Sequence, residues 1–470
     1  MPMQLLDNPQ YQAALGVVRS LRDRGHQAYL AGGCVRDLLL GIAAMDFDVA
    51  TSARPDEVIA LFPKTFAVGA HFGVVLVCDR IDGPDGAVEI QTEVATFRND
   101  GAYSDGRRPD AVRFSTDPRE DVQRRDFTVN GMLMDPIVYQ QTGDLQASVL
   151  DYVGGQADLA AKTLRAIGEP ARRFAEDKLR MLRAVRFAAR FGFTIEPRTF
   201  AAMREHASDI HQVSCERIRE ELTRILTEGR ARRGFELLDA AGLLQQLLPE
   251  VTRMHGVEQP PQYHPEGDVW VHTMLLLEKL PAGCSATLAW GALLHDIGKP
   301  ATFRAPAIPD DRIRFNGHVE VGVRVAEEIL RRLRFSNGDT AQVLALIRNH
   351  MRFGDVLQMK QSTLKRFLRL DRFDEHLALH HMDVTSAHGD LRLYEFTKQH
   401  YDRTEPETVR PKLLLTGQEL IAAGYRPGPQ FKAMLEFAED AQLESTIQTA
   451  AEALALVREH FGPQSAASIS

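Results

Sequence analysis

The first third of the chain alternates between two hydrophobic patterns. Apolar residues recur at helical spacing in "LGVVRSLRDRG", which ends at Gly25, and "QAYLAGG" reads as a short strand. Two further runs, "FGVVLVCD" and "VEIQTEVATFR", are rich in β-branched residues and are bounded by turn signals such as "DGPDG". Residues 1–155 are therefore expected to form a head in which helices accompany a mixed sheet.

Helical periodicity dominates from about residue 156 onward, as in "DKLRMLRAVRFAARF" and "CERIREELTRILTEG". A segment rich in proline and glycine, "GVEQPPQYHPEGD", interrupts it near residues 256–268 and indicates a domain boundary. The pattern predicts an α+β fold with a head at 1–155 and helical parts at 156–255, 256–400 and 401–470.

Composition narrows the class of protein. A length of 470 residues allows about three domains, and 44% hydrophobic with 26% charged residues is typical of a globular protein. The four cysteines are scattered without a CxxC pair, which favours reduced thiols over disulfides or a zinc site. Neither a signal-peptide pattern nor an apolar run near the roughly 20 residues of a membrane helix is evident. We therefore expect a soluble cytoplasmic protein with no membrane partner.

The net charge of −8 argues against a protein that binds nucleic acid through a generally basic surface. The segment 163–193 is nevertheless rich in arginine. These arginines either form a solvated helix face or line a groove for a phosphate backbone, and their spacing leaves both alternatives open.

The stretch "YLAGGCVRDLLLGIAAMDFDVAT" combines a double glycine with two aspartates. Glycines between a strand and a helix let the backbone approach a phosphate closely. Asp46 and Asp48 are two residues apart, so on a strand they project to the same side and repel each other unless a cation lies between them. Isolated, such a pair is more often two surface acids. After the glycine turn, it predicts a nucleotidyltransferase site whose carboxylates hold two Mg²⁺ ions.

A third carboxylate would complete such a metal site. Glu93 and Glu89 lie on one predicted strand and share its parity. We prefer Glu93, and a purely structural acid is the alternative.

A dense polar cluster follows in "EDVQRRDFTVNGMLMDP". Arg124 and Arg125 suit bidentate contacts to phosphate, while Asp126 and Asn130 suit ribose hydroxyls. Alone, the cluster also fits a capped helix start with surface arginines.

Together these motifs resemble a known family. "GGCVRDLLLG…MDFDVAT", "EVATFRNDGAYSDGRRPD", "RRDFTVNG", "EDKLRMLRAVRFAARFGF" and "ERIREEL" follow the order and approximate spacing of the five motifs of class II tRNA nucleotidyltransferases and bacterial poly(A) polymerases. The resemblance covers residues 25 to about 230 and implies a polymerase-beta-like head followed by a helical neck, body and tail. It implies template-free addition of CCA to tRNA from CTP and ATP, or of poly(A) to RNA, with Mg²⁺ in the head.

The same resemblance implies which residues bind the nucleotide. They are Gly33, Arg36, Arg125, Asp126, Asn130, Asp177, Arg180 and Arg183. One departure is Gly131, where the family usually has alanine, and we expect only a small packing effect from it.

The family assigns base selection to "EDKLR". On a helix, Asp177 and Arg180 at i and i+3 share a face. A carboxylate accepts and a guanidinium donates hydrogen bonds, which matches the pairing edges of cytosine and adenine but not those of guanine and uracil. An ordinary surface ion pair is the alternative. Residues 99–110 resemble the mobile loop of full CCA-adding members.

Histidines gather in the second half of the chain, within helical patterns. His272, His295, Asp296 and Asp383 resemble the metal ligands of the HD phosphohydrolase superfamily. His318 and His350 suit a second metal or the substrate phosphate, and Lys299 suits a phosphate contact. These ligand types fit Ni²⁺, Mn²⁺, Fe²⁺ or Co²⁺ without distinguishing among them.

The sequence therefore predicts a tRNA nucleotidyltransferase with a second activity as an HD phosphohydrolase. The alternatives are a poly(A) polymerase, or an HD phosphohydrolase whose head only binds RNA. The lack of a basic C-terminal arm leans against poly(A) synthesis, and the intact Asp46/Asp48, RRD and EDxxR sets argue against an inactive head.

Overall fold

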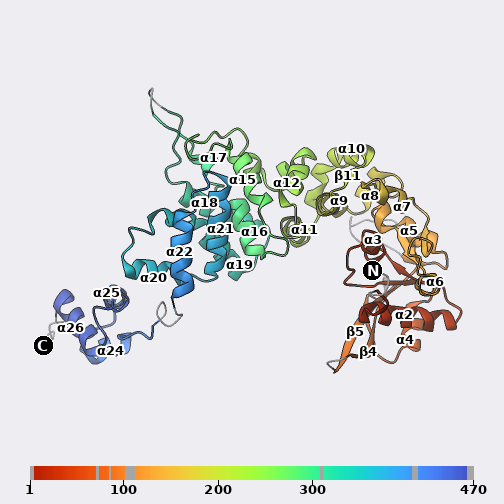
Figure 1. Ribbon diagram of the computed structural model, residues 1–470, viewed down its shortest axis with the longest axis horizontal. Helices are drawn as coiled ribbons and strands as arrows, with labels where there is room; N and C mark the ends of the chain where they lie inside the picture. Colours follow the sequence, from red (N-terminus) through yellow and green to blue (C-terminus); the bar gives the residue numbers. More distant parts are fainter. Residues whose placement is uncertain are drawn as a thin grey trace, which may run out of the picture. The chain divides into compact units, whose positions relative to one another are not determined.

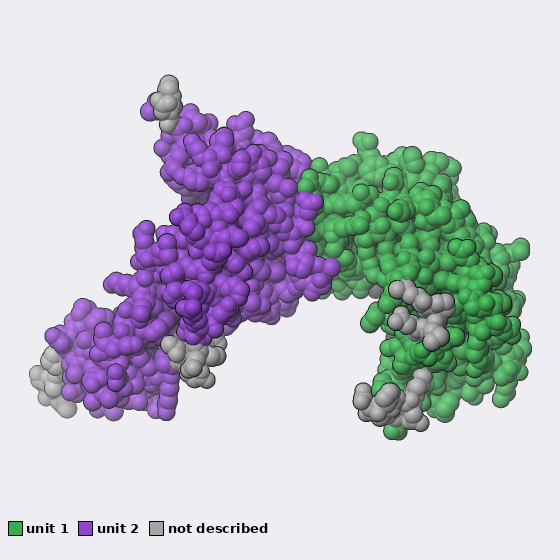
Figure 2. Space-filling view, viewed as in Figure 1, with its two compact units in different colours: residues 1–252 green, residues 253–470 purple. Residues whose placement is uncertain are grey.

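The computed structural model describes residues 5–69, 73–83, 86–100, 112–306, 308, 311–404 and 411–462. The chain divides into two compact units, residues 1–252 and 253–470, shown in green and purple in Figure 2. Within the described ranges, no helix is long and apolar enough to cross a membrane.

A mixed sheet forms the centre of the head. Seven strands of the described chain make it, in the order β3-β4-β5-β2-β1-β8-β9, and only β2 and β5 run parallel. The strands are β1 (Ala28–Ala31), β2 (Val49–Thr51), β3 (Thr65–Gly69), β4 (Val74–Gly83), β5 (Gly86–Thr96), β8 (Met132–Met134) and β9 (Val149–Asp151). Two-stranded ladders are formed by β6 (Arg98–Asp100) with β7 (Val112–Phe114), and by β10 (Thr163–Leu164) with β11 (Thr194–Ile195).

The helices of the head are short apart from the first. They are α2 (Pro9–Asp23), α3 (Gly33–Leu39), α4 (Pro55–Leu61), α5 (Pro118–Gln123), the 3₁₀ turn η2 (Thr128–Asn130), α6 (Pro136–Thr142) and α7 (Gly155–Ala160). Figure 1 shows α2 and α4 beside the long hairpin of β4 and β5, which both helices contact.

Helix α2 illustrates how sequence sets local structure. Pro9 occupies the first turn, where a missing N–H costs nothing, and the side chain of Asn8 accepts a hydrogen bond from the N–H of Tyr11 at 3.0 Å. Its apolar side, which includes Leu15 and Leu21, is completely buried. Each such side chain contributes about 1.5–3 kcal/mol relative to exposure. The amphipathic pattern thus fixes α2 against the sheet.

Helices alone complete the first unit. They are α8 (Pro170–Glu176), α9 (Leu179–Phe191), α10 (Pro197–Glu205), the 3₁₀ helix η3 (Ala207–Gln212), α11 (Cys215–Thr227), α12 (Ala231–Ala240), α13 (Leu243–Leu247) and α14 (Pro249–Thr252). Helix α9 packs against α11 and α12 and ends at Gly192, whose φ of 70° favours glycine.

The described part of the second unit is almost entirely helical. It contains α15 (Val269–Glu278), α16 (Ala286–Leu294), α17 (Lys299–Thr302), α18 (His318–Arg332), α19 (Asn337–Asn349), the 3₁₀ helix η4 (His350–Asp355), α20 (Gln361–Leu368), α21 (Phe373–Ser386) and α22 (Arg392–Arg403). Helix α16 is buried from Thr287 to Leu294 because α15, α19 and α21 surround it. Its C-terminal end therefore lies in the interior of the unit.

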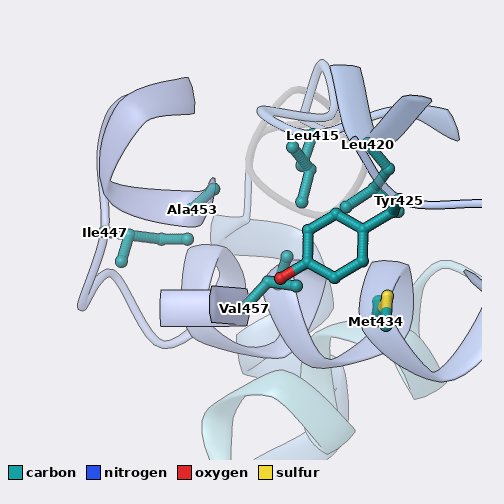
Figure 3. Close-up of a cluster of buried hydrophobic side chains, with 8 residues drawn as sticks. Leu415, Leu420, Tyr425, Met434, Ile447, Ala453 and Val457 are labelled. Atoms are coloured by element: carbon teal, nitrogen blue, oxygen red, sulfur yellow. The ribbon is translucent and has the colours of Figure 1, made fainter. Parts of the chain in front are cut away.

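The C-terminal helices form a small core of their own. They are α24 (Gly417–Ala422), α25 (Gln430–Leu443) and α26 (Ala450–Phe461). Figure 3 shows Tyr425 and Met434 among the aliphatic side chains of this core. Arg366 of α20 and Arg369, the residue that follows this helix, both contact Glu439 of α25, at 2.7 and 2.5 Å.

The predicted α+β fold, with a mixed-sheet head followed by helices, is confirmed. The division into four domains stays a prediction, beside the observed division at residues 252 and 253. Of the predicted loop at 99–110, only Asn99 and Asp100 are described, both on β6; residues 101–110 lie outside the described residues.

Candidate functional site

Asp46 and Asp48 lie in the extended segment that leads into β2. The structure places both just before the strand, not within it. Phe47 between them is only 4% exposed and points into the core, while both aspartates are exposed. The alternation therefore directs the two carboxylates away from the core, on the same side of the chain.

Strand pairing brings a third carboxylate to this place. In the parallel pair of β2 and β5, Val49 lies opposite Val94, so the preceding residues Asp48 and Glu93 are neighbours. Both line one small cavity of about 250 Å³. Glu89, by contrast, forms an ion pair with Lys64 farther along β5. The strand position alone does not distinguish the two glutamates, but the structure places only Glu93 beside Asp48.

The electrostatics of Asp48 fit a cation site. Although Asp48 is exposed at the rim of the cavity, the protein atoms around its carboxyl reduce its hydration. This desolvation, together with the negative charges of Glu93 and Asp46, raises its pKa to about 6, although Arg125 opposes the shift. Such mutual repulsion is relieved when a divalent cation binds between carboxylates. The three acids therefore suit Mg²⁺ through their oxygen ligands.

The double glycine lies beside the same carboxylates. Gly32 has a φ of 76°, a conformation that favours glycine. A Cβ atom at this position would come within 2.9 Å of the Arg125 guanidinium. Glycine here thus permits both the turn into α3 and the close approach of that arginine.

A cavity of about 460 Å³ extends from Asp48 across the neighbouring helices of the first unit. Every residue predicted to bind nucleotide lines it: Gly33, Arg36, Arg125, Asp126, Asn130, Asp177, Arg180 and Arg183. Arg124, which the sequence also assigns to phosphate, lines the cavity as well. Further lining residues that the site prediction missed are Gly32, Leu179, Arg186, Phe187, Arg190 and Arg217. Eight arginines face three aspartates, which gives an excess of positive charge suited to a triphosphate.

Asp126 joins the polar network of this cavity. Its Oδ2 accepts hydrogen bonds from Nε and Nη2 of Arg183, at 2.8 and 2.6 Å. Its Oδ1 accepts a hydrogen bond from the side-chain amide of Asn130. Asn130 Oδ1 in turn accepts a bond from Arg36. Burial alone would raise the pKa of Asp126, but Arg183 and Asn130 lower it to about 2. The network holds these groups in fixed directions around the cavity.

The prediction that Asp177 and Arg180 share a helix face is wrong. Asp177 has an extended backbone, with φ −143° and ψ 105°, in the break between α8 and α9. Its Oδ1 accepts the N–H of Leu179, the first residue of α9, which favours a helix start over a continuous helix. Both side chains still line the cavity, but each has other partners.

Those partners hold the two side chains separately. Arg217 of α11 donates to Asp177 Oδ2 at 3.0 Å. Arg180 donates to Glu176 at 2.9 Å and to the main-chain carbonyl of Arg124 at 3.0 Å. The two side chains that the sequence assigns to base reading are thus held by separate contacts, which include long-range ones to Arg124 and Arg217.

A second cluster lies in the interior of residues 253–470. His272 is on α15, His295 and Asp296 follow α16, His318 begins α18, His350 begins η4, and Asp383 is on α21. His272, His295, Asp296 and His350 are at most 4% exposed. The helices therefore bring together all six residues that the sequence assigns to metal or phosphate.

In four histidines of the cluster, Nδ1 makes a hydrogen bond. Nδ1 of His272 bonds to Glu266 Oε1 at 2.6 Å. In the other three, Nδ1 bonds to a main-chain carbonyl: that of Ala292 for His295 (2.9 Å), of Phe315 for His318 (2.9 Å) and of Ile347 for His350 (2.7 Å). A carbonyl oxygen only accepts, so each of those three Nδ1 atoms carries a proton and leaves Nε2 free as a ligand. Within the described chain, the buried Nε2 atoms of His272, His295 and His318 have no hydrogen-bond partner. This donor set fits a transition metal.

Asp296 lies between two groups of nitrogen ligands. Its Oδ2 is 3.1 Å from His295 Nε2 and 3.9 Å from His272 Nε2. Its Oδ1 is 3.8 Å from the Nε2 atoms of both His318 and His350. Asp383 Oδ1 lies 3.0 Å from His272 Nε2 and completes the first group.

Several contacts to this cluster were missed by the sequence reading. Glu266 and His264 lie in the segment that the sequence predicts to be a domain boundary, and both belong to a group able to bind metal together with His272. Lys299, predicted to contact phosphate, donates to Asp296 at 2.7 Å and to Gln259 at 2.7 Å. The proline- and glycine-rich composition hid these contacts because it resembles that of a linker.

Three families match separate parts of the chain. Residues 28–165 match the poly A polymerase head domain, residues 192–254 match the probable RNA and SrmB-binding site of polymerase A, and residues 268–382 match the HD domain. The first range contains Asp46 and Asp48, and the third contains most of the histidine cluster. Asp383 is the residue directly after the third range.

Curated relatives share substantial identity with the chain. The CCA-adding enzyme of Geobacillus sp. (strain WCH70) is 40% identical over 237 residues, which is 50% of this chain and 54% of the relative. The chain thus spans about half the length of this relative. The CCA-adding enzyme of Latilactobacillus sakei subsp. sakei (strain 23K) is 35% identical over 294 residues, 62% of this chain and 70% of the relative.

Solved structures extend the likeness to the whole chain. The crystal structure of the Bacillus stearothermophilus CCA-adding enzyme matches with a TM-score of 0.69 and 25% identity, covering 97% of this chain and 98% of the other. A Thermotoga maritima CCA-adding enzyme has the same fold, with a TM-score of 0.55, 18% identity and 98% coverage of both chains. Together with 35% identity across 70% of a curated relative, these likenesses lead to one conclusion: the chain belongs to the CCA-adding enzyme family.

Proposed function

We propose that this protein adds CCA to tRNA 3′ ends, taking CTP and ATP as substrates and releasing pyrophosphate in the cytoplasm. The observation that carries the proposal is the single cavity of about 460 Å³ that joins Asp48 to the arginines and to Asp177 and Arg180. The similar Bacillus stearothermophilus structure is a complex with CTP. CCA addition is therefore favoured over poly(A) synthesis.

The residues in and beside this cavity have distinct tasks. Asp46, Asp48 and Glu93 would hold Mg²⁺, which would activate the attacking hydroxyl and neutralise the leaving pyrophosphate. Arg124 and Arg125, clamped by the buried carboxylate of Asp121 at 2.7 and 3.0 Å, face the triphosphate. These contacts position the nucleotide against the carboxylates.

Base selection falls to the other end of the cavity. Asp177 accepts from the exocyclic amino group of cytosine or adenine, and Arg180 donates to the adjacent ring nitrogen. Guanine and uracil would place like groups against both side chains, at a cost of about 1–3 kcal/mol for each unmade hydrogen-bond set.

The test is to incubate a tRNA that ends before CCA with each nucleotide separately, with CTP and ATP together and with all four, and then to sequence the 3′ ends. We expect two cytidines with CTP alone and a complete CCA with CTP and ATP. Long adenosine tails would instead support poly(A) synthesis, and a lack of addition would contradict both readings.

We further propose that residues 253–470 carry a metal-dependent phosphohydrolase. The supporting observation is the set of buried Nε2 atoms of His272, His295 and His318, which have no hydrogen-bond partner among the described residues. A bound Ni²⁺, Mn²⁺, Fe²⁺ or Co²⁺ would polarise a phosphate ester and activate water for its hydrolysis.

The surroundings of the cluster offer room for a substrate. A cavity of about 700 Å³ adjoins His318 and is also lined by Arg312, Arg314 and Tyr263. Arginines suit the phosphate, and the half-exposed ring of Tyr263 suits a base. We therefore favour phosphate esters of nucleotides or RNA ends as substrates.

The double variant His295→Ala and Asp296→Ala tests this activity. We expect it to lose bound metal and hydrolysis of 2′,3′-cyclic nucleotides or 2′-nucleotides, while CCA addition by the head persists. If the unaltered protein neither binds Ni²⁺, Mn²⁺ or Co²⁺ nor hydrolyses these esters, the second activity is refuted.

A further inference from the structure

We propose that Glu266 is a positioning residue that makes the two ends of the histidine cluster unequal. It acts on His272, so that a divalent transition metal binds first between His272, His295, Asp296 and Asp383. The group of Asp296, His318 and His350 then fills at higher metal concentration. This inference rests on the proposed metal centre and adds an order of binding to it.

The contact between Glu266 and His272 is short and buried. Glu266 Oε1 lies 2.6 Å from His272 Nδ1, and the side chains are 7% and 0% exposed. The opposite ring nitrogen, Nε2, lies 3.0 Å from Asp383 Oδ1. The carboxylate of Glu266 therefore fixes the proton on Nδ1 and points the lone pair of Nε2 at the cluster.

His272 is the exception among the four histidines. The other three donate from Nδ1 to neutral main-chain carbonyls, at 2.7–2.9 Å. A hydrogen bond to a carboxylate is roughly twice as strong as one to a neutral acceptor, and it makes the imidazole more electron-rich. His272 is therefore the strongest nitrogen donor of the set. The end of the cluster that contains it also holds Asp383, the second carboxylate.

A second histidine holds Glu266 in place. His264 Nδ1 lies 2.9 Å from the same Oε1 atom, and the rings of His264 and His272 meet edge to face at 4.9 Å. Both histidines thus share one oxygen of Glu266. This arrangement restrains the carboxylate in the direction of His272.

The remaining oxygen argues against a purely structural role. Glu266 Oε2 is buried and has no hydrogen-bond partner within the described residues. Burying a half-satisfied carboxylate costs free energy that a structural acid avoids. Glu375 of α21 shows the contrast, because its two oxygens accept bonds from Ser285, Thr287 and Gln342.

A metal titration of the full-length protein separates these roles. The metal is removed with a chelator, and Co²⁺ is added while its visible absorption and the heat of binding are recorded. We expect two steps in the unaltered protein. In Glu266→Gln, the Co²⁺ affinity of the first step should fall by roughly 10- to 100-fold, because a metal-binding histidine loses the group that orients it. The affinity of the second step should not change.

Glu375→Gln is the matched control, since it alters an equally buried carboxylate of the same unit. We expect it to lower the melting temperature of the metal-free protein while leaving both binding steps unchanged. If Glu266→Gln fails to fold, Glu266→Asp gives the same test, because it keeps the charge but withdraws it from His272.

The outcomes distinguish the inference from the proposal beneath it. Two unchanged steps in the Glu266 variants would overturn the inference. An equal weakening of both steps, with a lower melting temperature, would assign Glu266 a structural role and overturn it too. If the unaltered protein binds no Co²⁺ at all, the metal centre itself is refuted.

Discussion

Arg217 of α11 donates a hydrogen bond to Asp177 Oδ2 at 3.0 Å and thereby ties α11 to the break between α8 and α9. Asp177 is also fixed by the N–H of Leu179, which donates to its Oδ1. A carboxylate held from two directions can present a defined edge to a base. In the proposed function, Arg217 would therefore support base selection, although it lies 40 residues from Asp177 along the chain.

Replacing Arg217 tests this relationship. In Arg217→Ala, Asp177 loses one of its two restraints, and incorporation of UTP and GTP should rise relative to CTP and ATP. We expect selectivity to fall by about 1–3 kcal/mol, measured as the ratio of kcat/KM values for the four nucleotides.

Arg224→Ala on the exposed side of the same helix is the control, and it should leave selectivity unchanged. Equal slowing of all four nucleotides in Arg217→Ala would show instead that the ion pair only supports the fold.

The two glutamates of β5 provide a matched pair for the metal site. Glu93→Gln removes a carboxylate next to Asp48, so nucleotide addition should slow by roughly tenfold or more, a loss of about 1.4 kcal/mol or more of transition-state stabilisation. Glu89→Gln alters an exposed acid that pairs with Lys64 and should retain full activity. The measurement is single-turnover addition of CTP to tRNA at several Mg²⁺ concentrations. Similar rates in both variants would exclude Glu93 from the site.

Local patterns predicted the elements and more than half of the residues that line the cavity of about 460 Å³. The β-branched runs became β4 and β5, and the eight predicted nucleotide-binding residues line one cavity. The elements were predicted correctly, and the eight residues share a cavity because motif residues lie at the ends of elements that the hydrophobic pattern already defines. That they bind a nucleotide stays a prediction.

The break at Asp177 could not be predicted in the same way. Helical periodicity runs through "EPARRFAEDKLRMLRAVRF", yet the side chain of Asp177 caps the N–H of Leu179 and pairs with Arg217, 40 residues later. Glu266 was missed for a related reason. It lies in an irregular segment, and its role depends on a contact with His272 that no periodicity encodes.

Gly131 lies in tighter packing than its sequence context suggests. A Cβ atom there would lie 2.9 Å from Ile167 Cδ1 and 2.9 Å from Val153 Cγ2, so alanine would force both side chains to move. We expect Gly131→Ala to lower the free energy of unfolding by about 1–3 kcal/mol, as other overpacked sites do. Chemical denaturation measures this change.

Gly16→Ala is the control for that variant. It lies within α2 and has nothing within 4 Å of the added methyl group, so it should be neutral or stabilising. A Gly131→Ala protein as stable as the original would show that Ile167 and Val153 move aside at little cost.

Acid should destabilise the second unit through His376 of α21. Burial of this ring lowers its pKa to about 4, with Arg352 acting in the same direction and Asp374 opposing. The side chain is 1% exposed, and neither ring nitrogen has a hydrogen-bond partner in the part of the chain that the structure describes. The folded protein therefore keeps His376 neutral at pH values where an unfolded histidine binds a proton.

The sign of the effect follows from this difference. Below a pH of about 6.5, the unfolded state gains a proton that the folded state does not take up, so stability falls as the pH decreases toward 4. From this group alone, the free energy of unfolding should fall by about 1.4 kcal/mol for each pH unit in this range. His376→Phe keeps an aromatic ring among its neighbours and removes the titration. Its unfolding free energy should therefore fall less between pH 7 and pH 5 than that of the unaltered protein, as measured by denaturant titrations, and an identical slope would contradict the assignment.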